Sequence, residues 1–203
     1  MATESTDEIV MRLALDQALN AQLSGEVPVG AVIVRSTPAG PQVVATGYNR
    51  PVTTNDPTAH AEIVALRHAA QLLGNYRLPD CEMFVTLEPC AMCAMAILHA
   101  RLKRVVYAAA DPKTGAAGSV IDVFGNGALN HQTVVTGGVL AEPAGALLRE
   151  FFAERRAQAR ADRLIEDGAF AAGGRGGDGD ADDALPEDIP TGDVIEPPEG
   201  EAP

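Results

Sequence analysis

The stretch DPTAHAEIVAL, residues 56–66, places His60 and Glu62 two positions apart where a helix is expected to begin. Histidine is a common metal ligand, and glutamate is a common proton carrier in catalysis. On a regular helix, side chains two positions apart point about 200° away from each other around the axis. The pair can therefore serve one site only if His60 precedes the regular helix. A histidine at a helix start is also compatible with a purely structural role.

A second stretch, TLEPCAMC, places Cys90 and Cys93 in a C-x-x-C pair at the expected start of another helix. Residues three apart share one helix face, and the unpaired N–H groups of a helix start favour the thiolate form that binds metals. A redox pair and two buried apolar residues are the alternatives for an isolated C-x-x-C.

The combination of the two stretches indicates a metal site. Two strand-to-helix junctions can lie side by side at the carboxyl ends of strands, where α/β sheets place their sites. His60, Cys90 and Cys93 would then supply one nitrogen and two sulfurs. Three protein ligands with an open fourth position are typical of catalytic zinc, whereas structural zinc sites usually have four.

The elements that must position these residues follow from apolar periodicity and from turn signals. The sequence predicts helices over 7–23, 59–73, from Pro89 to about Ala100, and from Pro143 to about Ile165. It predicts strands over 29–34, 42–49, 81–88, 103–110 and 132–139, the first two forming a hairpin, and a loop over 50–58. Strands separated by crossover helices predict an α/β fold with helices on both faces of one sheet.

Composition divides the chain into a domain, residues 1–166, and an acidic tail rich in glycine and proline, residues 167–203. The domain carries 17 acidic and 14 basic residues, and the tail carries 11 acidic residues and one basic residue, which together give the net charge of −13. We expect the tail to be disordered, because it has little apolar surface to bury.

Cellular location is predicted from what the sequence contains and lacks. No apolar run approaches the roughly 18 residues that span a bilayer, and the N-terminus is polar and acidic, unlike a signal peptide. The three cysteines fit a reducing compartment, so a soluble cytoplasmic protein is expected. Cys81, outside both motifs, is read as a buried apolar residue.

H-x-E followed by P-C-x-x-C is the signature of zinc-dependent nucleobase deaminases. With EVPVGAVIV, GYNRP, NYRL and DPKTGAAGSVIDV, the chain from about Glu8 to Arg156 resembles the bacterial tRNA-specific adenosine deaminases. The resemblance implies a three-layer α/β/α cytidine-deaminase-like fold with a mixed five-stranded sheet. It implies one zinc ion per subunit, held by His60, Cys90 and Cys93, with Glu62 as the proton shuttle. The implied reaction converts adenosine at the tRNA wobble position to inosine and ammonia.

The resemblance also implies substrate-binding residues, each with a structural alternative. Asn49 would hydrogen-bond the base edge, or it is a turn asparagine. Asp111 would accept from a ribose 2′-OH, or it caps a turn, and Lys113 would meet a phosphate, or it is simply solvated. Arg156 would line the groove for the anticodon loop, or it lies on a solvated helix face with the other arginines at helical spacing, Arg149, Arg160 and Arg163.

The implied partners are a tRNA anticodon stem-loop and a second copy of the chain in a homodimer, with no membrane. Two other functions stay open from the sequence. One is a deaminase of a free base or nucleotide, such as guanine, since the short motif is common to both classes. The other is a non-catalytic zinc or RNA-binding module, which Glu62 argues against because it has no task in a structural zinc site.

Overall fold

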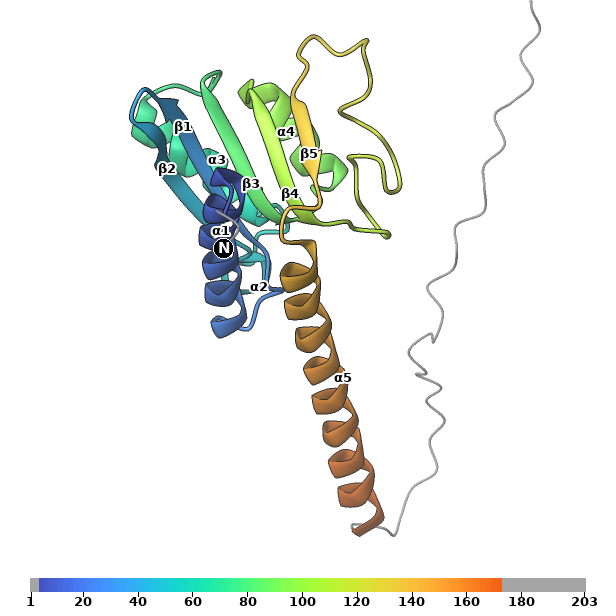
Figure 1. Ribbon diagram of the computed structural model, residues 1–203. Helices are drawn as coiled ribbons and strands as arrows, with labels where there is room; N and C mark the ends of the chain where they lie inside the picture. The colour runs from blue at the N-terminus through green and yellow to red at the C-terminus, as the bar shows by residue number, and fades with distance from the viewer. Residues whose placement is uncertain (1–3, 173–203) are drawn as a thin grey trace, which may run out of the picture. The chain divides into compact units, whose positions relative to one another are not determined.

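A mixed five-stranded sheet forms the centre of the computed structural model, which describes residues 4–172, with side chains to residue 165. The strand order is β2-β1-β3-β4-β5 (Figure 1). Strands β1 and β2 form an antiparallel hairpin, β1 also pairs antiparallel with β3, and β3, β4 and β5 are parallel. The strands are β1 Gly30–Thr37, β2 Gly40–Tyr48, β3 Cys81–Leu87, β4 Arg104–Ala109 and β5 Val134–Gly137. The predicted mixed five-stranded α/β fold is confirmed.

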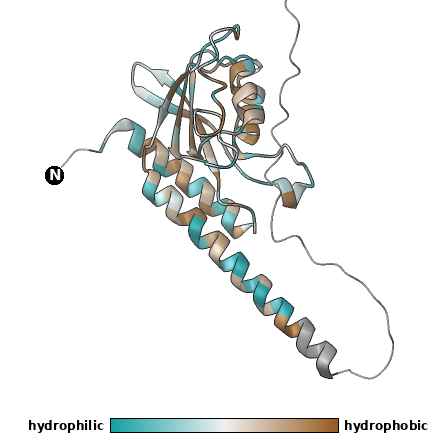
Figure 2. Ribbon diagram, turned by 90° about the vertical axis from the view of Figure 1, so that its right-hand side faces the viewer, coloured by the Kyte–Doolittle hydropathy of each residue, from teal (hydrophilic) through white to brown (hydrophobic). Residues whose placement is uncertain are grey.

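Helices cover both faces of this sheet because successive strand residues point to opposite sides. Ile33 and Met83 face a core shared with α3 and α4, whereas the adjacent Val32 and Phe84 face a core shared with α1 and the first turns of α5. Figure 2 colours the strands largely brown, as hydrophobic, and much of α5 teal. The helices are α1 Thr6–Leu23, α2 Pro51–Thr54, α3 Ala61–Leu73, α4 Ala91–Ala100 and α5 Ala141–Ala172.

Several predicted boundaries differ from the observed ones. Helix α4 begins at Ala91 with Cys90 as its N-cap, so Pro89 lies before the helix and not at its first position. Helix α2 lies where a loop was expected, with Pro51 at its start. Helix α5 continues to Ala172, past the predicted end near Ile165, and the remainder of the predicted tail lies outside the described residues.

The chain divides into two units, Met1–Ala161 and Asp162–Pro203. The first unit holds the sheet, helices α1 to α4 and the start of α5. Cys81 is buried in its core, as the sequence predicted. Among the described residues, no helix is long and apolar enough to cross a membrane.

Four strands end at the same edge of the sheet, β5 among them because it is parallel to β4. Strand β2 runs in the same direction as β3, because both are antiparallel to β1, and β4 is parallel to β3. The residues that follow these strands, Asn49 after β2, Glu88 after β3 and the segment beginning at Asp111 after β4, are therefore brought to one edge.

Helix α3 approaches this edge through Gly47 of β2. A Cβ atom on Gly47 would lie 2.5 Å from the carbonyl oxygen of Ala61 and 2.6 Å from the backbone nitrogen of Ala65. Both distances are far below a van der Waals contact, so any side chain at this position must push the helix away from the sheet.

We expect Gly47→Ala to lower the free energy of unfolding by about 1–3 kcal/mol, because the added methyl group overpacks the contact between β2 and α3. Urea denaturation of the zinc-loaded protein measures the change. Gly127→Ala is the matched control, because a Cβ atom there meets nothing within 4 Å. Equal stability of the two variants would contradict the predicted close contact.

Candidate functional site

His60 is the N-cap of helix α3, with extended backbone angles φ −67° and ψ 154°. The chain reaches this position through a tight turn in which the Asp56 carboxylate accepts hydrogen bonds from the Thr58 backbone N–H, at 2.8 Å, and from its hydroxyl, at 2.6 Å. His60 therefore stands outside the regular helix, and Glu62 lies within its first turn. The expectation that His60 precedes the helix is confirmed.

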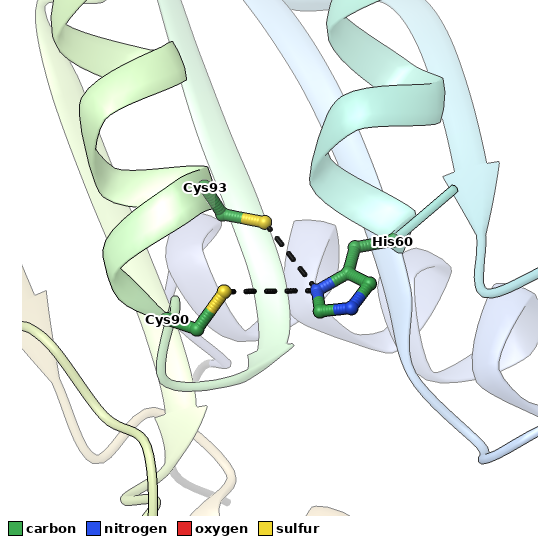
Figure 3. A group of neighbouring side chains, drawn as sticks. All are labelled: His60, Cys90 and Cys93. Atoms are coloured by element: carbon green, nitrogen blue, oxygen red, sulfur yellow. Dashed lines mark hydrogen bonds between the residues drawn. The ribbon is translucent and has the colours of Figure 1, made fainter. Parts of the chain in front are cut away.

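Cys90 holds the equivalent position at the start of α4, with φ −74° and ψ 171°. Cys93 follows within the first turn and is buried. The two helix starts thus present their side chains toward each other, as Figure 3 shows.

The three predicted ligands meet at one point. The Nδ1 atom of His60 lies 3.7 Å from the Cys90 sulfur and 3.6 Å from the Cys93 sulfur, and all three atoms lie within 4.8 Å of one another. Tetrahedral zinc with its usual bond lengths to nitrogen and sulfur separates such ligand atoms by about 3.6 Å. The donor set and its spacing therefore fit a zinc ion bound through His60 Nδ1.

The two sulfurs differ in protonation without a metal. A hydrogen bond from the Cys93 side chain, helped by one from His60, lowers the pKa of Cys90 to about 4. The same hydrogen bond to Cys90, together with burial, raises the pKa of Cys93 well above its usual value. The pair thus consists of one thiolate and one thiol, and zinc binding requires the thiol to lose its proton.

Glu62 is 4 % exposed, and this burial raises the pKa of its carboxyl to about 6. A hydrogen bond from its own backbone N–H opposes the rise, and the nearby His60 and Cys93 add smaller opposing contributions, which places the carboxyl beside the ligand group. Among the described residues, the group of atoms spaced to hold a metal contains His60, Cys90 and Cys93 but not Glu62. Glu62 is thus positioned next to the metal site as a titratable group.

Asn49 is nearly buried directly after β2, and its side-chain oxygen accepts a hydrogen bond from the Ala61 backbone N–H at 2.8 Å. This contact ties the end of β2 to the start of α3, next to His60. The asparagine oxygen therefore has a structural task, and the side-chain NH2 group is the donor that remains for a base edge. The base contact itself stays a prediction.

The segment after β4 begins with a turn closed by Asp111. Its carboxylate accepts from the backbone N–H of Lys113, at 2.9 Å, and from the Thr114 hydroxyl, at 2.7 Å. Asp111 therefore acts as the turn cap that was one of its two sequence interpretations, and its ribose contact stays a prediction. Lys113 is exposed, as either of its interpretations requires.

The arginines of α5 lie on an exposed helix face. Arg149 forms an ion pair with Glu142 at 2.6 Å, and Arg156 is exposed. Arg155, which was outside the predicted set, donates to the Gly25 carbonyl and stacks on the Phe151 ring. These positions leave the proposed RNA contact of Arg156 as a prediction.

Glu88 is the buried polar residue at this edge that sequence reasoning missed. It is 2 % exposed and lies between strand β3 and Cys90. Its signal in the sequence is the only charged residue in the largely apolar stretch FVTLEPC, where a buried carboxylate needs several hydrogen-bond donors.

Comparison with known proteins identifies this arrangement. Residues 4–109 match the zinc-binding region of the cytidine and deoxycytidylate deaminases. The chain is 46 % identical to a tRNA-specific adenosine deaminase of Haemophilus influenzae, over 78 % of this chain and 90 % of that protein. It is 39 % identical to the tRNA-specific adenosine deaminase of Bacillus subtilis, over 77 % of this chain and 95 % of that protein.

Solved structures give the same fold. A structure from a study of A-to-I editing by tRNA:A34 deaminases at the wobble position superposes with a TM-score of 0.64 and 43 % identity, covering 68 % of this chain and 97 % of that one. A guanine deaminase from Nitrosomonas europaea also has a TM-score of 0.64, but 27 % identity, covering 75 % of this chain and 87 % of that one.

We expect zinc affinity to fall as the pH is lowered from about 8 to about 6. The raised pKa of Cys93 keeps its proton in the metal-free site, so each bound zinc must displace at least that proton, at a cost of about tenfold in affinity per pH unit. Competition with a chelator across this range measures the slope, and an affinity independent of pH would contradict the assignment.

A pair of cysteine variants controls this experiment. Cys93→Ala should abolish stoichiometric zinc binding, whereas Cys81→Ala should leave it intact, because Cys81 is equally buried but lies outside the ligand group.

Proposed function

The chain belongs to the cytidine and deoxycytidylate deaminase family, in the branch of the tRNA-specific adenosine deaminases, and we propose that it deaminates adenosine at the tRNA wobble position. The products are inosine and ammonia. The observation that carries this proposal is the buried carboxyl of Glu62 beside the His60–Cys90–Cys93 group. A structural metal site has no use for such a titratable neighbour, whereas hydrolytic deamination requires one.

Zinc held by His60, Cys90 and Cys93 would supply a water molecule activated for attack at neutral pH. Glu62 performs the proton transfers. Its carboxylate accepts the proton that the water loses on bonding to C6 of adenine. It delivers this proton to the ring nitrogen. As the bond between C6 and the amine breaks, the same carboxylate takes the proton of the new C6 hydroxyl and passes it to the departing amine, so that one water is added and one ammonia released with charge in balance. With no metal bound, burial raises the pKa of Glu62 to about 6, so the group is ionised at neutral pH.

The choice of adenosine in tRNA over a free base rests on sequence rather than on the fold. The guanine deaminase from Nitrosomonas europaea and the structure from the tRNA:A34 deaminase study superpose equally well on this chain. This chain is 43 % identical to the protein from the tRNA:A34 deaminase study and 27 % identical to the guanine deaminase. The arginine-bearing face of α5 also suits a polymer groove, which a small-molecule deaminase does not need.

The finer contacts with RNA are part of the proposal. We assign the anticodon stem-loop as the part of the tRNA that binds, Asn49 to the base edge, Asp111 to a ribose 2′-OH, and Lys113 and Arg156 to phosphates. The exposure of Lys113 and Arg156 supports these roles. The homodimer, in which each subunit helps to shape the groove of the other, stays an implication of the family resemblance.

We expect the purified protein to convert a wobble adenosine in an anticodon stem-loop to inosine, and Glu62→Ala to lower this rate at least about 10³-fold while zinc content is unchanged. Inosine formation and bound zinc are measured on the same samples. Glu62→Gln serves as a variant of equal size.

The alternatives give different results in this assay. Conversion of free guanine without conversion of RNA would support the small-molecule deaminase. Bound zinc without either activity would support a non-catalytic module, and loss of zinc from both Glu62 variants would contradict its assignment as a non-ligand.

Asn49→Asp separates the two tasks of Asn49. The carboxylate keeps an oxygen for the Ala61 N–H, so the start of α3 should stay in place, but the NH2 donor is lost. If that donor binds the base, kcat/KM should fall about 100-fold, because a site built to hydrogen-bond a substrate penalises a missing partner. Unchanged kcat/KM with retained zinc would show that Asn49 only holds the helix.

A further inference from the structure

Glu88 joins the metal-binding turn to the segment after β4. Its side chain is 2 % exposed, and it precedes Cys90 by two residues. A buried carboxylate is costly unless its oxygens accept hydrogen bonds. The identity of its donors therefore shows what this residue holds together.

Within the part of the chain that the structure describes, the Glu88 side chain accepts four hydrogen bonds, and all of them come from residues 111–119. One carboxylate oxygen accepts from the backbone N–H groups of Ala117, at 2.8 Å, and Ser119, at 3.2 Å. The other accepts from the backbone N–H of Asp111, at 3.0 Å, and from the Ser119 hydroxyl. Both ends of the segment are thus fixed to one side chain.

The backbone of the same segment also contacts the cysteine turn. The Ala116 N–H donates to the Pro89 carbonyl at 2.9 Å, and Gly115 forms a β-bridge with Cys90. A Cβ atom on Gly115 would lie 2.5 Å from the Glu88 carboxylate, so only glycine allows this approach. The segment that carries Asp111 and Lys113 is therefore packed directly on the turn that carries a zinc ligand.

We propose that Glu88 is a positioning residue that holds segment 111–119 against the Cys90 turn. This segment, which we call the substrate-binding wall, is thereby fixed relative to the metal. Glu88 is buried beneath the segment and acts through Asp111, Ala117 and Ser119 rather than on the substrate itself. A wall fixed before binding avoids the entropy cost of ordering it around the RNA. The inference rests on the proposed function only for the identity of the substrate.

Glu88→Gln is the informative variant. A glutamine has one accepting oxygen, so its NH2 group must face either the two amides of Ala117 and Ser119 or the amide of Asp111. At least one backbone donor loses its acceptor in each orientation. Ser119→Ala is a milder second variant, because it removes the hydroxyl and leaves every backbone hydrogen bond in place.

The matched control is Glu82→Gln, at the opposite end of strand β3. Glu82 contacts Arg104 and Ser36, remote from the cysteine turn along the strand. The two Glu→Gln changes thus differ in which end of β3 they alter.

Hydrogen exchange on the zinc-loaded full chain tests the inference without reference to activity. In Glu88→Gln, we expect exchange at the amides of Asp111, Ala117 and Ser119 to speed up by about tenfold or more, while amides within β3 keep their protection. Glu82→Gln should leave the segment unchanged. Unaltered exchange in the segment, or an equal increase throughout β3 and α4, would overturn the proposal.

Kinetics with the anticodon stem-loop provide the second readout. We expect Glu88→Gln to raise KM about tenfold with kcat within about threefold of the parent protein and zinc content retained, and Ser119→Ala to change KM in the same direction by less. A fall in kcat at constant KM would overturn the proposal, because it indicates a disturbed metal turn and not a released wall. If the parent protein does not deaminate RNA, the proposed function fails, and the exchange experiment still decides the role of Glu88.

Discussion

The meeting of two helix starts is the constraint on which the rest of the structure depends. His60 and Cys90 are N-caps of α3 and α4, and their ligand atoms must come within 4 Å of each other. An N-cap has extended backbone angles, so its side chain can point away from the helix face that packs on the sheet. The remaining first-turn residues, Glu62 and Cys93, then lie on the inner side. The two-residue spacing of His60 and Glu62, unsuited to cooperation on a regular helix, becomes the means of placing a ligand and a proton carrier at one point.

The two buried carboxyl groups at this edge, Glu62 and Glu88, have pKa values that are shifted in opposite directions. Glu62 is desolvated with few donors, so its pKa rises to about 6 and it can exchange protons near neutral pH. Glu88 is equally closed to solvent but less deeply enclosed by protein, and it accepts four hydrogen bonds, so its pKa is lowered. The number of donors, and not burial alone, decides which acid is suited to catalysis and which to holding structure.

The sequence was sufficient for features determined by local patterns. Alternating and helical periodicities predicted all five strands and the four longer helices, and the spacing of His60, Cys90 and Cys93 predicted their meeting. Features determined by distant contacts escaped prediction. Helix α2 depends in part on the buried Glu26, which accepts from the Thr53 N–H at 2.7 Å across 27 residues. The role of Glu88 depends on donors more than 20 residues away, and no local pattern indicates such partners.

The metal ligands and Glu62 lie in an earlier part of the chain than most of the residues proposed to bind RNA. The region matched to the zinc-binding deaminases ends at residue 109, and it contains every ligand and Glu62. The residues proposed to contact the ribose and the phosphates of the RNA all lie after residue 109; they are Asp111, Lys113 and Arg156. If the proposed RNA contacts are made, selectivity for a polymer belongs to these later segments, and the guanine deaminase from Nitrosomonas europaea can have the same fold without it. Glu88 lies within the shared region but binds the segment that follows it, so the position of the substrate wall is set from the metal turn.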